Sequence, residues 1–210
     1  MSNGYCMPTT TASIGELGAR LNGDPGLVAA AEAALRVGVH WDTQVRPPHT
    51  HRVAQVFASA LPVLYAKSTK STDWETFARL VLRAAYDATL AAAHCKHRRP
   101  VEKGGEGGNS DKRIAVYLTA LGGGAFGNRQ GWICDAIAEG LERHRDAPLD
   151  VYLVHRGTKP KSVWKGLGKG FPRPVVEGAV VEREGQGQVR RVGAGGKGGG
   201  TNETSARYSV

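Results

Sequence analysis

The chain has 210 residues, of which 40% are hydrophobic, and its 28 Lys/Arg against 19 Asp/Glu give a formal net charge of +9. This length suits one domain with extensions. The sequence contains no apolar run of about eighteen residues, which excludes a transmembrane helix, and its start lacks the pattern of a signal peptide. Cys6, Cys95 and Cys134 are too few and too scattered for a disulfide framework, so we expect reduced thiols and a cytoplasmic or nuclear protein without a membrane partner.

The positive charge is unevenly distributed along the chain. Residues 1–155 contain 17 Lys/Arg and 15 Asp/Glu, whereas residues 156–210 contain 11 and 4. From residue 185 onward the sequence is basic, glycine-rich and poor in large apolar side chains, which predicts a disordered tail after one possible short strand at 175–181. Such a tail either binds RNA or another anionic partner weakly through its charge, or is an extension with no binding role.

The first 38 residues predict two short helices. Residues 13–16 fit a capping box, with Ser13 as the N-cap of a short helix through Leu21 that Asn22 and Gly23 end. Asp24 as N-cap and Pro25 as the first helical residue predict a second helix, for which Gly38 is a plausible C-terminal cap.

A short apolar stretch at residues 39–45 is interrupted by polar side chains. His40 and Asp42 flank Trp41 there, and together they could line a pocket and act as acid or base groups. The alternative is an edge segment whose polar side chains form local hydrogen bonds. Two histidines in the following turn, His49 and His51, have no third ligand at useful spacing, so neither a metal nor a cofactor is expected.

The next elements are a strand, a helix and a connection. Residues 52–63 predict a buried strand that ends near Pro62. Residues 72–75 form a second capping box, which predicts a core helix through about His94. Residues 96–112 carry four glycines and mixed charge without apolar periodicity, and they predict a flexible loop.

The most informative stretch follows this loop. Residues 114–121 are mostly apolar and predict a buried strand, which stops at three consecutive glycines beginning with Gly122. From residue 132 to 141 apolar side chains recur at intervals of three and four, as in an amphipathic helix. A second apolar run at 149–154 predicts another strand, so the whole stretch predicts a parallel βαβ unit.

A glycine loop between a strand and a helix has a specific physical use. Glycine allows positive φ and lets backbone N–H groups approach a ligand closely, and the following helix adds the positive end of its dipole. The loop therefore predicts a phosphate site, with Phe126 as an apolar face for a ribose or a base. The alternative is a tight turn with no ligand.

In the order of these elements, residues 72–155 resemble the C-terminal half of a macrodomain, the module that binds ADP-ribose. The helix at 80–93 and the strand at 114–121 resemble the corresponding elements of that family. Residues 124–128, Gly-Ala-Phe-Gly-Asn, resemble its second phosphate loop, in which Gly, Ile or Val, Tyr or Phe, Gly, and Tyr or Phe follow one another. The helix and strand after the loop match in length and order.

The resemblance implies an α/β fold with three α/β/α layers, a mixed sheet and helices on both faces, and ADP-ribose or an ADP-ribosylated protein as partner. The residues of the implied binding loop are Gly122, Gly123, Gly124, Ala125, Phe126, Gly127 and Asn128. Gly124, Ala125 and Gly127 would present their backbone to the diphosphate, and Phe126 would lie against the distal ribose. Asn128 stands where the family usually has an aromatic residue.

The family's first half, which supplies the adenine contact and much of the catalytic machinery, has no counterpart in residues 1–71. No catalytic residue is therefore assigned, and only His40, Asp42 and Asn128 are candidates for an ADP-ribosyl hydrolase. The predicted organisation is a helical segment at 1–38, a macrodomain-like core at 39–155 and a basic tail at 156–210. Four functions stay open: an ADP-ribose binder, a hydrolase, an RNA-binding protein that uses the tail, and a degenerate structural macrodomain. The sequence specifies no oligomeric state.

Overall fold

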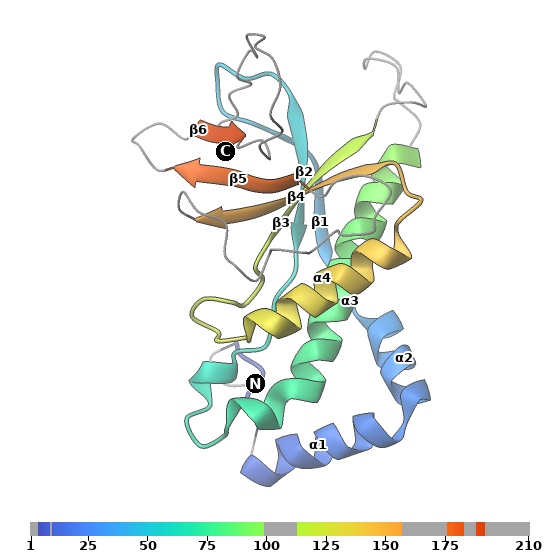
Figure 1. Cartoon of the computed structure of the whole chain (residues 1–210), viewed down its shortest axis with the longest axis vertical. Helices are drawn as coiled ribbons and strands as arrows, with labels where there is room; N and C mark the ends of the chain where they lie inside the picture. Colours follow the sequence, from blue (N-terminus) through green and yellow to red (C-terminus); the bar gives the residue numbers. More distant parts are fainter. Residues whose placement is uncertain (1–3, 9, 99–112, 157–175, 183–187, 192–210) are drawn as a thin grey trace, which may run out of the picture. The chain divides into compact units, whose positions relative to one another are not determined.

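A computed structural model describes residues 4–8, 10–98, 113–156, 176–182 and 188–191 (Figure 1). Helices and strands combine in a mixed α/β fold. The chain forms two compact units, each built from three separate segments. The first unit comprises residues 1–38, 56–92 and 120–145, and the second comprises 39–55, 93–119 and 146–210. The predicted helical segment therefore belongs to the first unit, while the predicted core at 39–155 contributes to both.

Two helices open the first unit. Helix α1 (Thr11–Gly23) has Thr10 as its N-cap, and the side chains of Thr10 and Ser13 bond each other's backbone N–H in a capping box. The prediction of Ser13 as N-cap is therefore wrong by one turn, because Thr10 takes that role and Ser13 returns the bond. Helix α2 (Pro25–Ala34) has Asp24 as N-cap, as predicted, but it ends before Gly38.

The longest helix, α3 (Glu75–Arg98), starts after two short 3-10 segments, η1 (Val63–Tyr65) and η2 (Ser71–Trp74). The predicted core helix is confirmed, but it extends beyond His94 into the predicted flexible loop. The rest of that loop, residues 99–112, lies outside the described residues. Helix α4 (Gln130–Arg143) buries the apolar face that the sequence predicts. The largest fully buried side chains of the first unit are Trp74, Leu82, Leu90, Ile133 and Ile137.

The second unit contains a four-stranded sheet in the order β3-β4-β5-β6 (Figure 1). Its strands are β3 (Ile114–Thr119), β4 (Leu149–Arg156), β5 (Val176–Glu182) and β6 (Gln188–Arg191). Strand β4 runs parallel to both β3 and β5, whereas β6 is antiparallel to β5. The predicted parallel βαβ unit and the predicted strand near 175–181 are both confirmed.

Strand β6 corrects part of the tail prediction. A composition rich in glycine and charge predicts disorder, but the backbone of residues 188–191 pairs with β5, an interaction that periodicity within one segment does not reveal. The other calls on the tail fall on residues outside the described ranges. No helix in the described part of the chain is long and apolar enough to cross a membrane.

Strands β1 (Gly38–Gln44) and β2 (Arg52–Phe57) form a separate two-stranded sheet. The predicted buried strand at 52–63 is wrong in both length and burial. Strand β2 stops at Phe57, and its side chains are mostly exposed, with Phe57 itself 59% exposed. A two-stranded sheet lacks the neighbours that would bury both of its faces, so apolar residues here do not imply a core position.

The side chains of β3 alternate between buried and exposed, so the prediction of a fully buried strand at 114–121 is wrong on one face. Val116 and Leu118 are buried, whereas Ala115, Tyr117 and Thr119 are exposed. The apolar character of the strand suggested burial on both faces, as in most parallel sheets. Here Tyr117 satisfies the apolar pattern but stands on the open face.

Charge divides along the two units. The first unit holds 9 Lys/Arg and 9 Asp/Glu, and the second holds 19 and 10. The entire formal net charge of +9 therefore belongs to the second unit.

Candidate ligand-binding loop

The loop of residues 122–128 joins β3 to α4 and lies in the first unit. Gly122 and Gly127 have φ of +69° and +71°, a region that side chains with a Cβ rarely occupy. A Cβ at Gly122 would lie 2.4 Å from the Cβ of Ala60, and one at Gly127 would lie 2.1 Å from Cγ of Leu64. Both positions therefore require glycine for conformation and for space.

Three N–H groups of the loop are used inside the unit. The amides of Gly123, Gly127 and Asn128 donate to the carbonyls of Ala120, Gly124 and Gly122, each at 3.0 Å. These bonds give the loop a fixed shape, but they leave the three amides unable to bind a phosphate without rearrangement. The predicted diphosphate contact of Gly127 is therefore not supported by this geometry.

The side chain of Asn128 holds the end of the loop in place by a hydrogen bond to the segment before η1. Its side chain is 3% exposed, and its Nδ2 donates to the carbonyl of Leu61 at 2.8 Å. A phenylalanine, one of the residues usual in the resembled family, has no donor with which to make this bond. Asn128 thus has a structural role that the sequence did not indicate, and a buried position of this kind does not suit a catalytic group that must contact substrate.

The tip of the loop is chemically different from its base. Gly124 and Ala125 are exposed, and a Cβ built on Gly124 would meet no atom within 4 Å. Among the described residues, no acceptor bonds the amides of Gly124, Ala125 and Phe126. These three consecutive N–H groups are the part of the predicted site that stays available to a ligand.

The loop leads directly into α4, whose N-terminus has no side-chain cap. Arg129 occupies the N-cap position, and its side chain makes no capping bond. Its guanidinium instead donates to Oγ of Ser71 at 2.8 Å and lies over the ring of Trp132, 5.4 Å from the centroid. Within the described part of the chain Arg129 has no carboxylate partner, so its positive charge adds to that of the helix end.

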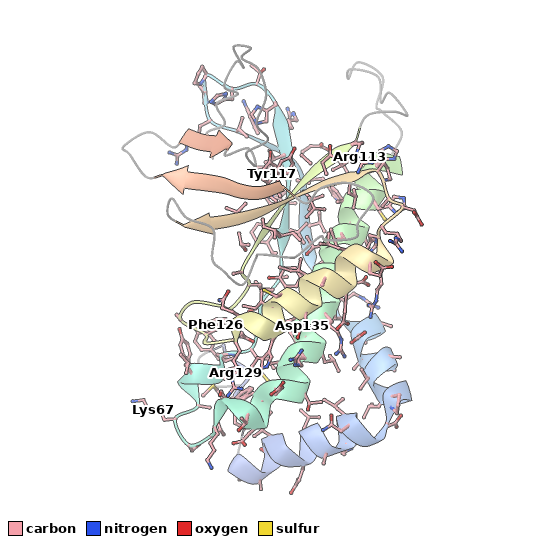
Figure 2. The ribbon with its side chains drawn as sticks, viewed as in Figure 1. Lys67, Arg113, Tyr117, Phe126, Arg129 and Asp135 are labelled. Carbon is pink, nitrogen blue, oxygen red and sulfur yellow. The ribbon has the colours of Figure 1, made fainter. Side chains whose placement is uncertain are left out.

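Aromatic rings gather beside the tip. Tyr5, Tyr65 and Phe126 form three edge-to-face pairs with centroid separations of 5.1 to 5.9 Å. Tyr65 is 40% exposed, and the N–H of neighbouring Leu64 donates to the carbonyl of Phe126 at 3.0 Å. Figure 2 shows Phe126 and Arg129 on the same short segment, whereas Lys67 extends outward.

The start of the loop is tied to α3. The N–H of Leu121 donates to Oη of Tyr86 at 2.9 Å, and Tyr86 is buried. Burial raises the pKa of the Tyr86 phenol far above its usual value, so it stays protonated at every ordinary pH. A neutral side chain therefore holds the point where β3 gives way to the loop.

Two of the three hydrolase candidates, His40 and Asp42, belong to the second unit. His40 and Asp42 lie on β1 and are exposed. Asp42 has a φ of 54°, forms an ion pair with Lys96, and accepts a bond at its carbonyl from Arg52 at 2.9 Å. The bond from Arg52, on the neighbouring strand β2, matches the alternative interpretation of an edge segment, whereas Lys96 is 54 positions away in the sequence. The three candidates His40, Asp42 and Asn128 are not gathered within one unit.

The sequence offers no sign that Tyr5 and Tyr65 belong beside the loop. Both lie in segments without periodicity, about sixty residues apart, and only the folded chain brings them to Phe126. Arg129 could have been noticed as a basic residue at a helix start, directly after the loop.

No protein-family model matches the chain, and comparisons with curated proteins and with solved structures give no match either. The chemistry of the loop is therefore inferred from its own residues. In the described ranges, no group of three or more His, Cys, Asp or Glu side chains could hold a metal ion. Cys6, Cys95 and Cys134 form no disulfide with one another.

Proposed function

We propose that the chain binds ADP-ribose, or a closely related nucleotide diphosphate, at the tip of the glycine loop. The observation that carries this proposal is the set of three consecutive amides at residues 124–126 that have no acceptor in the described part of the protein. A run of N–H groups without acceptors, in the loop that leads into a 14-residue helix, is a favourable position for an anion.

One neighbouring feature supports a nucleotide over a simple phosphate. Phe126 and Tyr65 offer apolar ring faces and edges for a ribose or base. Arg129, at the N-cap of the helix that follows the loop, supplies a positive charge that favours an anion of either kind. The predicted site thus narrows to Gly124, Ala125 and Phe126, while Gly122, Gly123, Gly127 and Asn128 shape the loop.

The macrodomain-like architecture is part of the same proposal. A parallel βαβ unit with a glycine loop after its first strand supports it, since ligands of open α/β sheets bind at the carboxyl ends of strands. A third layer would cover the face of the sheet that carries Tyr117, and that residue is 50% exposed, so the proposal is limited to the βαβ unit and its loop.

The experiment is calorimetric titration of ADP-ribose into the full chain and into Gly124→Glu. We expect the variant to lose at least about tenfold in affinity, because its carboxylate occupies and repels the phosphate position. Folding should be unaffected, since a Cβ at Gly124 enters open space and this glycine has no positive φ. ADP, ribose 5-phosphate and inorganic phosphate identify which part of the ligand is recognised.

Gly15→Glu is the matched control. Gly15 is an exposed glycine of α1 whose built Cβ also meets no atom within 4 Å, so this variant adds the same charge to the same unit. Equal ADP-ribose affinity for Gly124→Glu and Gly15→Glu would contradict the proposal, as would no binding by a folded wild-type sample.

A further inference from the structure

The open face of the β3–β4 sheet in the second unit carries a pair of stacked aromatic rings. Tyr117 and Tyr152 are direct neighbours in the parallel register, with ring centroids 5.0 Å apart and planes inclined by 18°. Tyr117 is 50% exposed although it is in the middle of a strand. Figure 2 labels Tyr117 on β3.

The residues next to this pair on the same face have smaller side chains. On one side along the strands lie Ala115 and Asp150, and on the other lie Thr119 and Val154. None of these four side chains is as large as tyrosine, and Ala115 and Thr119 are exposed. The opposite face of the same strands is buried, so the two rings form a distinct aromatic platform on a rigid sheet.

An ion pair between Arg113 and Asp150 lies at one end of the platform. Nε of Arg113 lies 2.6 Å from Oδ1 of Asp150, and the same guanidinium also bonds the carbonyl of Leu149. This ion pair neutralises the carboxylate on the open face, which would otherwise repel an anion. Arg113 keeps part of its surface exposed at this end.

The unit that carries the platform has a net positive charge. Its sequence holds 19 Lys/Arg against 10 Asp/Glu, of which 8 and 5 lie in the described residues, whereas the other unit is neutral. Exposed aromatic rings on a sheet surface offer every nucleobase a stacking partner, and a net positive charge attracts the phosphate backbone.

We infer that this platform binds single-stranded nucleic acid, with bases stacked on Tyr117 and Tyr152 and the backbone attracted by the positive charge of the second unit. Stacking requires unpaired bases, so duplexes should bind more weakly than single strands. This function uses different residues from the glycine loop and does not depend on it.

The test is fluorescence anisotropy with the full chain and labelled twelve-residue oligouridine, oligothymidine and a duplex of equal length. Tyr117→Val and Tyr152→Val remove a ring but keep a residue that favours strands. We expect each to weaken single-strand binding by about five- to a hundredfold, since stacking on one aromatic side chain contributes that much. Tyr117→Phe keeps the ring and should bind within about twofold of wild type.

Phe57→Ala is the matched control, because it removes a ring that is 59% exposed on another strand. It should leave single-strand affinity unchanged. Comparable affinity for RNA and DNA is expected from stacking alone, and a preference for either one identifies the natural strand. Unfolding midpoints for each variant show whether a loss reflects the fold.

Three outcomes would overturn the inference. The first is wild-type affinity in the Tyr117→Val, Tyr152→Val double variant, and the second is equal affinity for duplex and single strand. The third is a dimer of the wild-type chain, seen by sedimentation without nucleic acid, that Tyr117→Val dissociates; the platform would then be covered by a second copy. A variant that does not fold is replaced by Tyr117→Thr, to which the same criteria apply.

Discussion

The two units of this chain carry candidate sites of opposite chemistry. The first is neutral, with 9 basic and 9 acidic side chains, and its candidate site consists of backbone amides at a helix start. The second carries the whole net charge of +9, and its candidate site consists of two tyrosine rings. Fixed dipoles act at short range on one ligand geometry, whereas net charge acts over a Debye length on any polyanion.

The first unit is therefore suited to selecting one ligand, and the second to attracting any polyanion. On the proposed function, the neutral unit would distinguish a diphosphate by the shape of its loop, because little non-specific charge competes. The basic unit would attract any nucleic acid, and ring stacking would favour single strands. The net charge of the whole chain does not show that one unit is neutral and the other basic.

The largest expected effect comes from breaking the shape of the loop. Gly122→Ala forces a Cβ onto a backbone with φ +69° and places it 2.4 Å from Cβ of Ala60 and 2.6 Å from Nδ2 of Asn128. Left-handed strain and overpacking together should lower the free energy of unfolding by about 2–5 kcal/mol. Urea denaturation measures this change.

Gly124→Ala is the comparison within the same loop. It adds the same methyl group at an ordinary φ into open space, so the free energy of unfolding should stay within about 0.5 kcal/mol of wild type. If both alanine variants are equally stable, the loop does not have the internal structure described here.

Much of the fold of the glycine stretch is predictable because local patterns decide it. The glycines end β3, the spacing of apolar residues defines α4, and the short apolar run after it forms β4. Burial is less predictable. Tyr117 and Phe57 continue apolar patterns and yet are exposed, since the sheet partners that decide which face is covered come from elsewhere in the chain.

The sequence predicts where the candidate site lies, but not which of its groups can bind a ligand. The run of glycines identifies the loop, whereas the turn that the loop adopts decides which of its amides are already hydrogen-bonded. The amide of Gly127 closes onto Gly124, and Asn128 reaches Leu61, which is 67 residues away in the sequence. Such long-range contacts leave no local pattern, and Tyr65 joins Phe126 in the same way.

Salt should distinguish the two sites. Raising NaCl from about 50 to about 200 mM should weaken single-strand binding roughly twentyfold if about three phosphates are neutralised. ADP-ribose binding at the neutral unit should change by no more than about threefold, because a small diphosphate carries no condensed counterion atmosphere to release. Anisotropy and calorimetry at both salt concentrations check this; equal salt dependence of the two ligands would argue against separate sites.

The smallest effect concerns the bond that holds the loop to α3. Tyr86→Phe removes the acceptor of the Leu121 N–H, a bond of 2.9 Å in a part-buried position. We expect the free energy of unfolding to fall by about 1 kcal/mol at pH 7, the usual contribution of one such bond. Chemical denaturation measures the change, and Tyr65→Phe, which alters an exposed tyrosine, should have almost none.

The pH dependence of the difference in stability between wild type and Tyr86→Phe gives a second test of the same hydrogen bond. Burial raises the pKa of Tyr86 in the folded chain, whereas an unfolded tyrosine loses its proton near pH 10. Above about pH 10 the unfolded chain therefore binds fewer protons than the folded one, and the free energy of unfolding falls as pH rises. Tyr86→Phe lacks this titration, so the stability advantage of wild type should shrink between about pH 9 and pH 11. An advantage that stays constant over that range would mean that the phenol is not buried against the loop, and the first unit would lose the contact that fixes where its glycine loop begins.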